Sequence, residues 1–335
     1  MQASPTDYAE EVRAWASVLR SSKTSTLKFA VARAILDEVR DVATAQGEVH
    51  ISRNRLSHRL VSYYWYQVRL FRLKQAAAEI QEPNVVRKLR DLDEGSDGKW
   101  HPSRPYIQEV VNFVAEVGFR EVIPRFHSGI EGTIFEARAD GAIAILGRPH
   151  AFVAAFEPLL TRSVMAGWAE QVEQYNLTPR VLAKVSFDGR RRTSVSKWAK
   201  PLRKLDDACF YCRTAKPEHA QVDHVVPWSF LFDDAAWNLV LACDGCNNSK
   251  RDSVPGARFL TALCERNRDL TAQRPAGDFA ARVYFSMTQL PLGGTDGLRQ
   301  SLDMLCEQAY LQGFPGDWSP SQRTPAGFAY RENPA

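Results

Sequence analysis

The sequence lacks several features that would place it outside the globular proteins. Its longest apolar stretches, 142–146 and 151–156, fall far short of the ~20 residues that a membrane helix needs. Glycine and proline, 19 and 18 of 335 residues, are too few for a collagen-like or low-complexity chain. The first residues lack the basic and apolar regions of a secretory signal. We therefore expect a cytoplasmic protein without a membrane span.

The chain also lacks a large excess of positive or negative residues. The chain has 43 Lys and Arg against 39 Asp and Glu, a formal net charge of +4, so total charge alone does not indicate a polyanionic partner. Apolar residues make up 44% and charged residues 24%, which is typical of globular domains. At ~150 residues per domain, the length of 335 residues predicts two to three domains.

Hydrophobic periodicity predicts a mostly helical chain with little strand. Apolar residues recur every three or four positions in three segments of the N-terminal third, and a longer helix is expected further on, with a kink or restart at Pro158. Asp140-Gly141 lies between two short apolar runs and predicts a hairpin, because its tight turn needs positive φ. The expected helices cover 26–43, 56–71, 107–117 and 151–172, and the hairpin strands 133–137 and 142–146.

The fold class predicted is α+β, a mostly helical chain that carries one small domain containing strands. The polar run 91–98 is the best early boundary, because it combines glycine with acidic residues. Four parts are expected in chain order. They are a helical region (1–98), a helix, hairpin and long-helix region (99–178), a basic segment with the site-bearing domain (179–272), and C-terminal helices with a tail (273–335).

A basic segment immediately precedes the most informative part of the chain. Residues 180–204 hold nine Lys or Arg and a single acid, Asp188. Such a run is either a solvated linker or a surface that follows nucleic-acid phosphates, and the motifs that come next favour the second interpretation. The predicted nucleic-acid contacts are Arg190, Arg191, Arg192, Lys197 and Lys200.

Four of the six cysteines form two Cys-x-x-Cys pairs. The pairs Cys209/Cys212 and Cys243/Cys246 are separated by 30 residues, more than the ~15–20 of a simple zinc ribbon. Four thiolates are the ligand set of a closed, tetrahedral Zn²⁺ site, which is structural rather than catalytic. We therefore expect a zinc site with an additional element looped out between the pairs. Cys264 and Cys306 lie in helical patterns and are expected to be small buried apolar groups.

The looped-out element has the pattern strand, loop, strand, helix. Residues 221–228 are extended and β-branched, 239–242 form a second apolar run, and 247–250 begin a helix. His224 titrates near neutral pH and can take a proton from an attacking water, while Asp223 points to the opposite face of the strand. Phosphodiester hydrolysis needs such a base together with positive charge on the phosphate.

The order of these motifs resembles the HNH endonuclease family, which has the ββα-metal fold. The motifs are Cys-x-x-Cys, Asp-His-Val-Val-Pro, Trp-Asn-Leu-Val and Cys-x-x-Cys-Asn-x-x-Lys, and they span about residues 202–255. The resemblance implies metal-dependent DNA cleavage with His224 as the base, Asn238 orienting it, and Asp223 and Asn247 as ligands of a divalent cation. Many members carry histidine where this chain has Asn247, so ligand hardness favours Mg²⁺ or Mn²⁺.

Several roles stay open on the sequence. Lys250 either contacts a phosphate or is a surface lysine, and Asp233 and Asp234 either extend the metal site or cap a turn. Trp228 and Trp237 are expected to lock the catalytic loop, and His219 is expected to be a loop residue.

Three functions are compatible with these motifs. The first is a bacterial restriction or anti-phage DNA endonuclease that acts with other components of a defence system. The second is a ribonuclease or toxin with the same site, because the ββα motif does not read the 2′ hydroxyl. The third is a catalytically silent zinc-ribbon protein that only binds DNA.

Overall fold

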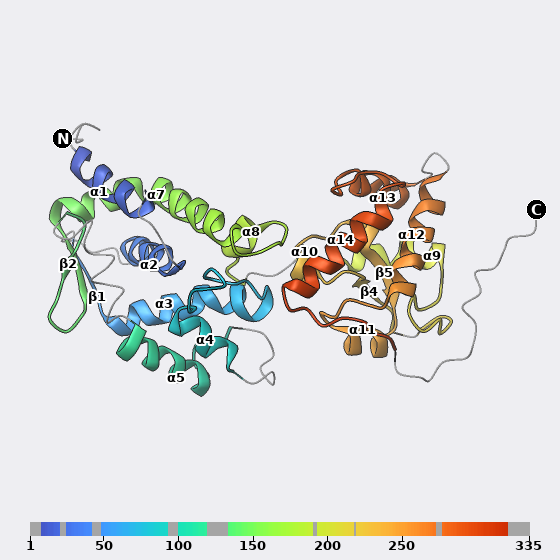
Figure 1. The fold of residues 1–335 in the computed structure, drawn as a ribbon, viewed down its shortest axis with the longest axis horizontal. Helices are drawn as coiled ribbons and strands as arrows, with labels where there is room; N and C mark the ends of the chain where they lie inside the picture. Colours follow the sequence, from blue (N-terminus) through green and yellow to red (C-terminus); the bar gives the residue numbers. More distant parts are fainter. Residues whose placement is uncertain are drawn as a thin grey trace, which may run out of the picture. The chain divides into compact units, whose positions relative to one another are not determined.

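The chain forms two compact units, Met1–Arg190 (unit 1) and Arg191–Ala335 (unit 2). A computed structural model describes residues 8–20, 25–41, 48–92, 100–118, 133–189, 193–217, 219–272 and 277–320. The predicted α+β class is confirmed, because helices dominate both units and the strands form only small sheets (Figure 1). Within the described residues, no helix combines the length and apolar character needed to cross a bilayer.

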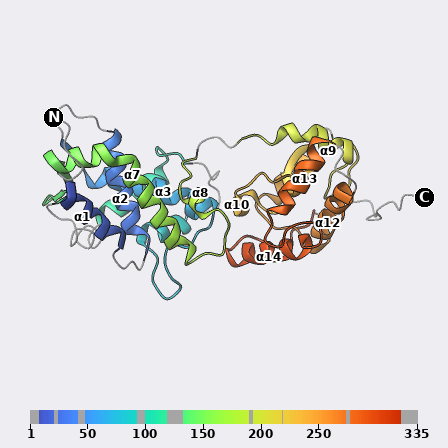
Figure 2. The same cartoon turned by 90° about the horizontal axis from the view of Figure 1, so that it is seen from above.

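Unit 1 is a helical assembly with one small sheet at its edge. Helix α2 packs against both α7 and α3 and lies between them (Figure 1). Figure 2, seen from above, shows the long helix α7 running across α2. The sheet has the order β1-β3-β2 with antiparallel pairs. The elements are α1 (Ala9–Arg20), α2 (Leu27–Asp41), β1 (Glu48–Ile51), α3 (Arg53–Trp65), a π-helix (Tyr66–Leu70), α4 (Asn84–Arg90), α5 (Pro105–Phe113), a second π-helix (Val114–Gly118), β2 (Glu136–Ala137), β3 (Ile143–Leu146), α7 (Gly147–Glu173) and α8 (Val181–Val185).

The structure refines three expectations for unit 1. The hairpin expected around Asp140-Gly141 is present, with Gly141 at φ 76° in the turn between β2 and β3. No break occurs at Pro158, because α7 continues through it as one 27-residue helix. The sheet gains an unexpected third strand, since Val49 in β1 pairs with Ile145 in β3 from far away in the sequence.

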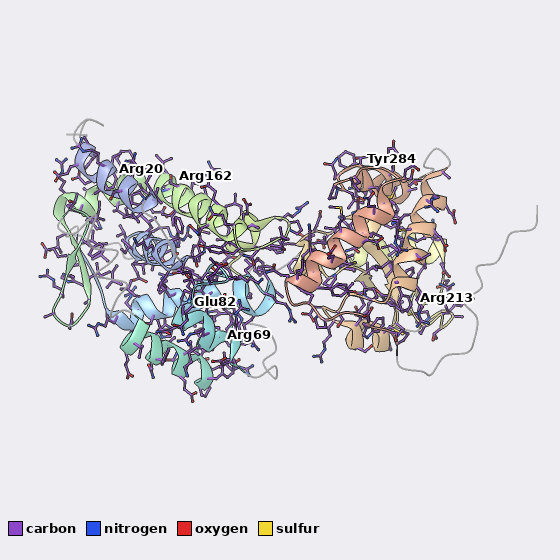
Figure 3. The ribbon with its side chains drawn as sticks, in the orientation of Figure 1. Arg20, Arg69, Glu82, Arg162, Arg213 and Tyr284 are labelled. Carbon is purple, nitrogen blue, oxygen red and sulfur yellow. The ribbon has the colours of Figure 1, made fainter. Side chains whose placement is uncertain are left out.

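Unit 2 surrounds a two-stranded antiparallel sheet with helices. Its core contains Leu239–Ala242 of β5, Phe259 of α12 and Val283 of α13, all fully or nearly fully buried. Outer faces remain exposed, as Tyr284 on α13 illustrates (Figure 3). The elements are a 3-10 turn (Ser196–Trp198), α9 (Ala199–Leu205), β4 (Gln221–His224), α10 (Trp228–Leu231), a second 3-10 turn (Ala236–Asn238), β5 (Leu239–Ala242), α11 (Asp244–Lys250), α12 (Ala257–Ala272), α13 (Asp278–Thr288) and α14 (Leu298–Leu311).

A candidate nuclease site in unit 2

The order β4, loop, β5, α11 places every chemically interesting motif of unit 2 in one small substructure. Strands β4 and β5 pair antiparallel, with Asp223 opposite Val240 and His224 opposite Leu239. Helix α11 follows β5 after a single residue, Cys243. Because side chains alternate along a strand, Asp223 and His224 point to opposite faces of this sheet. The predicted strand, loop, strand, helix order is thus present.

The four cysteines converge on one point. Their Sγ atoms all lie within 4.8 Å of one another, and the Sγ atoms of Cys212 and Cys243 are 3.7 Å apart. A tetrahedral site with Zn–S bonds of about 2.3 Å requires sulfur atoms roughly 3.8 Å apart, so the spacing of these thiols fits a zinc ion. The four cysteines could therefore hold a metal ion, as their spacing in the sequence predicts.

Backbone hydrogen bonds shape both knuckles for this convergence. The Cys209 N–H donates to the Thr214 carbonyl at 2.9 Å and closes the first turn. The Phe210 N–H donates to the Leu241 carbonyl at 2.7 Å, which ties that turn to β5. In the second knuckle, Cys243 precedes the first turn of α11 and its carbonyl accepts from the Asn247 N–H at 2.9 Å. A metal at the four thiols would therefore clamp the junction between β5 and α11.

His224 lies at the end of β4 and is buried, with 5% of its surface exposed. Its Nε2 is 3.0 Å from Oδ1 of Asp234, whose side chain is about a third exposed. Asp234 comes from the loop between α10 and the turn that precedes β5. This pairing was not foreseen, because the sequence offered Asp234 only as a cap or an additional metal ligand. A carboxylate on one imidazole nitrogen fixes the orientation and tautomer of the ring.

Asn238 is fully buried and bonds the segment that follows His224. Its Oδ1 accepts from the Val226 N–H and its Nδ2 donates to the Val226 carbonyl, both at 2.8 Å. The backbone continues this pairing, because the Val225 N–H donates to the Asn238 carbonyl at 3.0 Å. The side-chain amide therefore extends the hydrogen bonding between the two chain segments beyond the end of β4, and it fixes the chain just after His224. Trp237 is buried beside it, and Trp228 contacts Phe232 in the same loop.

Asp223 belongs to a buried polar cluster on the face of β4 that meets α11. Its Oδ2 accepts from the Tyr211 hydroxyl at 2.6 Å and lies 3.2 Å from the Lys250 ammonium. Burial, together with the Asp223 carboxylate, raises the pKa of Tyr211 well above its usual value, so this hydroxyl remains a donor. The oxygen Oδ2 is therefore engaged, and Oδ1 is the Asp223 atom that could ligate a cation.

Lys250 lies inside the unit rather than at its surface. The side chain has no exposed area, and its ammonium donates to the His224 carbonyl at 2.6 Å. Burial lowers the pKa of Lys250, and the neighbouring Asp223 carboxylate opposes that shift. In this arrangement the ammonium binds Asp223 and the backbone of His224, so Lys250 holds the two neighbouring site residues in place.

Asn247 lies on the first turns of α11, toward the same face of β4 as Asp223. Its Nδ2 donates to the Gln221 Oε1, while the Gln221 amide nitrogen bonds Asp244. This orientation leaves the Asn247 amide oxygen as the atom that could ligate a cation. An aspartate oxygen and an amide oxygen are hard donors of the kind that Mg²⁺ or Mn²⁺ accepts. The donor set of these two residues therefore fits a hard divalent cation.

The predicted nucleic-acid contacts are described only in part. Arg190, Arg191 and Arg192 lie outside the described residues. Lys197 and Lys200 are both exposed, and the Lys197 ammonium lies 5.2 Å from the centre of the Trp198 ring. His219 is an exposed loop residue.

The comparison with known families agrees with this geometry. The model of the HNH endonuclease family matches residues 212–256, which include Cys212, both strands, the loop and α11. The match begins after Cys209, which the four-sulfur cluster adds to the substructure. Searches with the chain found no matching curated protein and no matching solved structure. Residues 212–256 therefore form an HNH endonuclease domain within unit 2, and the resemblance predicted from the motifs is confirmed.

One prediction concerns Lys250, because a buried ion pair depends on both partners. Replacing Lys250 with methionine keeps the length of the side chain but leaves the Asp223 carboxylate buried, with Tyr211 as its one remaining donor among the described residues. We expect a loss of roughly 3–5 kcal/mol in the free energy of unfolding, typical of a broken buried pair. Urea unfolding of the full chain measures it.

The matched control for this prediction is the exposed Lys197, whose change to methionine should alter stability by less than about 0.5 kcal/mol. A double variant with Asp223→Asn should recover part of the loss, because it removes the unpaired charge. Equal stabilities of Lys250→Met and Lys197→Met would contradict the tethering role of Lys250.

Proposed function

We propose that this chain is a metal-dependent endonuclease that hydrolyses phosphodiester bonds of DNA. The observation that carries the proposal is His224, held at the end of β4 by Asp234 inside the segment that matches the HNH endonuclease family. Hydrolysis of a phosphodiester needs a rigidly held base to take a proton from water, and oxygen donors that can hold a cation.

In the proposed mechanism His224 is the general base. The contact between Nε2 and Asp234 orients the ring, and the imidazole takes the proton from the attacking water. The Asp234 carboxylate stabilises the imidazolium that this transfer forms. Lys250 and Asn238 keep His224 in place through its own carbonyl and through the backbone of Val226.

Asp223 and Asn247 would hold the catalytic Mg²⁺ or Mn²⁺. When bound, such a cation supplies positive charge for the phosphate and for the leaving 3′ oxygen. The four cysteines would hold a structural Zn²⁺ that fixes α11, and with it Asn247, relative to β4. With water attacking phosphorus and the 3′ oxygen leaving, the products carry 5′ phosphates.

The basic residues near the domain would bind the nucleic-acid backbone. Lys197 and Lys200 are exposed, and together with Arg190, Arg191 and Arg192 they would contact phosphates without reading the sequence. Such binding weakens as salt is added, because each neutralised phosphate releases counterions. The cellular role we propose, restriction or anti-phage defence in the bacterial cytoplasm together with other defence components, rests on the resemblance of the motifs.

Incubation of purified protein with supercoiled plasmid in Mg²⁺, Mn²⁺ or EDTA tests the proposal. We expect cleavage with either metal and none in EDTA, and the ratio of nicked to linear product reports how many strands are cut. Parallel incubation with duplex DNA, single-stranded DNA and RNA distinguishes a DNA endonuclease from a ribonuclease. DNA binding with no cleavage in any metal would instead support a zinc-ribbon protein that only binds DNA.

A second prediction concerns Asp234, which contacts His224 rather than the substrate. Replacing Asp234 with asparagine retains the size of the side chain but removes the charge that stabilises the imidazolium. We expect kcat to fall on the order of 10- to 100-fold with KM little changed, because a general base contributes ~10²–10⁴-fold and loses part of that when its partner is neutral. Steady-state cleavage of a labelled DNA duplex gives both constants.

Asp278 provides the control for Asp234. It is an exposed aspartate at the start of α13 that pairs with Arg282 at 3.3 Å, so Asp278→Asn should leave both constants unchanged. A drop in DNA affinity alone for Asp234→Asn, with kcat retained, would show that Asp234 does not act through His224.

A further inference from the structure

Unit 1 contains a cavity that the nuclease proposal does not use. It has a volume of about 1030 Å³ and lies between α2, α3, α7 and the segment that begins with α8. Small-molecule sites commonly measure ~300–1,000 Å³, so this cavity has room for a ligand of that size. All of its lining residues belong to unit 1.

One wall of the cavity is built from aromatic rings that are already fixed in place. The ring centres of Tyr63 and Trp168 are 6.3 Å apart at an angle of 82°, and Trp168 is almost completely buried. The Tyr63 hydroxyl donates to Asp37 at 2.6 Å, and the Trp168 indole N–H donates to Gln75 at 3.4 Å. These contacts hold both rings in place as a rigid wall beneath the cavity.

A second pair of aromatic rings lines the cavity beyond the C-terminal end of α3. Tyr66 and Phe187 lie 5.0 Å apart at 71°, and each is only partly buried. Aromatic faces of this kind stack on nucleobases, a contact that contributes regardless of which base is present. The cavity therefore offers the rings of Tyr66 and Phe187 to a planar heterocycle.

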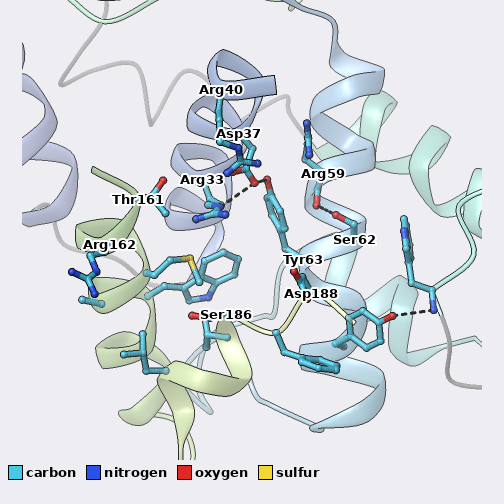
Figure 4. A pocket seen from close by; sticks show the side chains of 18 residues that line it. Arg33, Asp37, Arg40, Arg59, Ser62, Tyr63, Thr161, Arg162, Ser186 and Asp188 are labelled. Carbon is cyan, nitrogen blue, oxygen red and sulfur yellow. Dashed lines mark hydrogen bonds and ion pairs between the residues drawn. The ribbon is translucent and has the colours of Figure 1, made fainter. Parts of the chain in front are cut away.

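Four arginines from three helices also line the cavity. Arg33 and Arg40 come from α2, Arg59 from α3 and Arg162 from α7. Figure 4 shows Arg33, Asp37 and Arg40 side by side, with Tyr63 directed at Asp37 from the neighbouring helix. Against the four arginines, the lining contains two aspartates, Asp37 and Asp188.

Ion pairs within the wall orient these arginines without using all of their donors. Arg33 contacts Asp37 through Nε at 3.0 Å, and Arg59 contacts Glu38 and Asp41. Each guanidinium has five N–H donors, so Arg33 keeps its terminal nitrogens for a ligand. Arg162 forms no ion pair with any residue that the structure describes. The Asp37 charge is already shared between Arg33 and Arg40.

We propose that this cavity binds a nucleoside phosphate. Its base would stack on the partly buried rings of Tyr66 and Phe187, and its phosphates would meet Arg33 and Arg162. Guanidinium groups match phosphate oxygens in geometry and charge. The four arginines would repel a divalent cation. An acyl chain would cover the guanidinium groups without giving them hydrogen-bond acceptors. The proposal concerns unit 1 alone and holds whether or not unit 2 cleaves DNA.

Isothermal titration calorimetry of the full chain tests the proposal. The titrants are ATP, GTP, CTP and UTP, with adenosine and inorganic phosphate as half-ligands, in buffer without added divalent cation. We expect at least one triphosphate to bind with a stoichiometry of one and to bind at least tenfold more tightly than either half-ligand. Arg33→Gln and Arg162→Gln should each weaken that binding roughly tenfold.

The control variant is Arg138→Gln, which removes an exposed arginine that pairs with Glu136 at 3.2 Å outside the cavity. It should leave nucleotide affinity unchanged. Arg162 is itself exposed, so its replacement tests the cavity without disturbing the core. The proposal is overturned if no triphosphate binds, if phosphate alone binds as tightly, or if the two arginine variants bind normally. Binding of an oligothymidylate through the same arginines, with no triphosphate binding, would overturn it in favour of a nucleic-acid groove.

Discussion

Replacing His224 with alanine should abolish metal-dependent DNA cleavage while DNA binding persists. Imidazole is the kind of side chain whose ordinary pKa suits proton transfer at neutral pH, and His224 lies in the Asp-His motif of the segment that matches the HNH endonuclease family. We expect the rate constant for cleavage of a supercoiled plasmid to fall ~10²–10⁴-fold, the contribution of a general base. Single-turnover cleavage in Mg²⁺ measures this fall, and a gel-shift titration measures binding separately.

His219 is the matched control for this experiment. It lies five residues before His224 in the sequence, and it is exposed in the loop that precedes β4. His219→Ala should therefore cleave at the normal rate. Because His224 is buried, a second variant, His224→Gln, guards against a loss caused by unfolding, and its thermal midpoint should stay close to that of the unchanged protein. Full activity of a folded His224→Gln protein would exclude His224 as the base.

Much of the candidate site could be predicted because its signals are local in the sequence. The paired Cys-x-x-Cys spacings predict the convergence of four sulfur atoms, and the apolar runs around Asp223 and Leu239 predict the two strands. The hairpin at Asp140-Gly141 was also predictable, because a tight turn leaves a two-residue signature. In each case the residues that determine the structure are neighbours or lie at a fixed short spacing.

Other features depend on contacts between segments, which periodicity does not reveal. Asp234 meets His224 only because the loop after α10 folds back over the end of β4. Lys250 is buried because α11 turns that side of the helix toward Tyr211 and Asp223, although a helical lysine is usually exposed. Strand β1 was not predicted, since its partner β3 lies far along the chain. Pro158 is tolerated inside α7, against the local rule for proline.

The cavity of unit 1 could not have been found from sequence either. Its walls combine Arg33 from α2, Tyr63 from α3 and Arg162 from α7, which no short motif connects. Each of these residues also fits an ordinary amphipathic helix, where arginine lies at the surface and tyrosine at the edge of the core. The packing of α2 against both α3 and α7 is what brings them together around one cavity.

Removing metal from the four cysteines should unfold the nuclease domain. The sheet of unit 2 has only two short strands, and α11 has only seven residues, so neither would be stable alone. A structural zinc in a small domain contributes ~10–16 kcal/mol in isolated zinc-finger peptides, which is more than the usual net stability of a domain. We therefore expect chelation to abolish cleavage and to lower the thermal midpoint of unfolding. Elemental analysis before and after chelation should show the loss of one zinc ion per chain.

The cysteines themselves separate this effect from nonspecific damage by the chelator. Cys212→Ser should lose zinc and cleavage together, because serine is a poor ligand for zinc and the other three thiols cannot complete a tetrahedron. Cys306→Ala removes a buried thiol that lies on α14, outside the cluster, and should retain one zinc per chain and normal cleavage. If Cys212→Ser kept its zinc, or if zinc-free protein cleaved DNA in Mg²⁺ at the normal rate, the four cysteines would not be the structural support of α11. The positions of Asn247 and Lys250, both on α11, would then have to be maintained by the packing of β4 and Tyr211 alone.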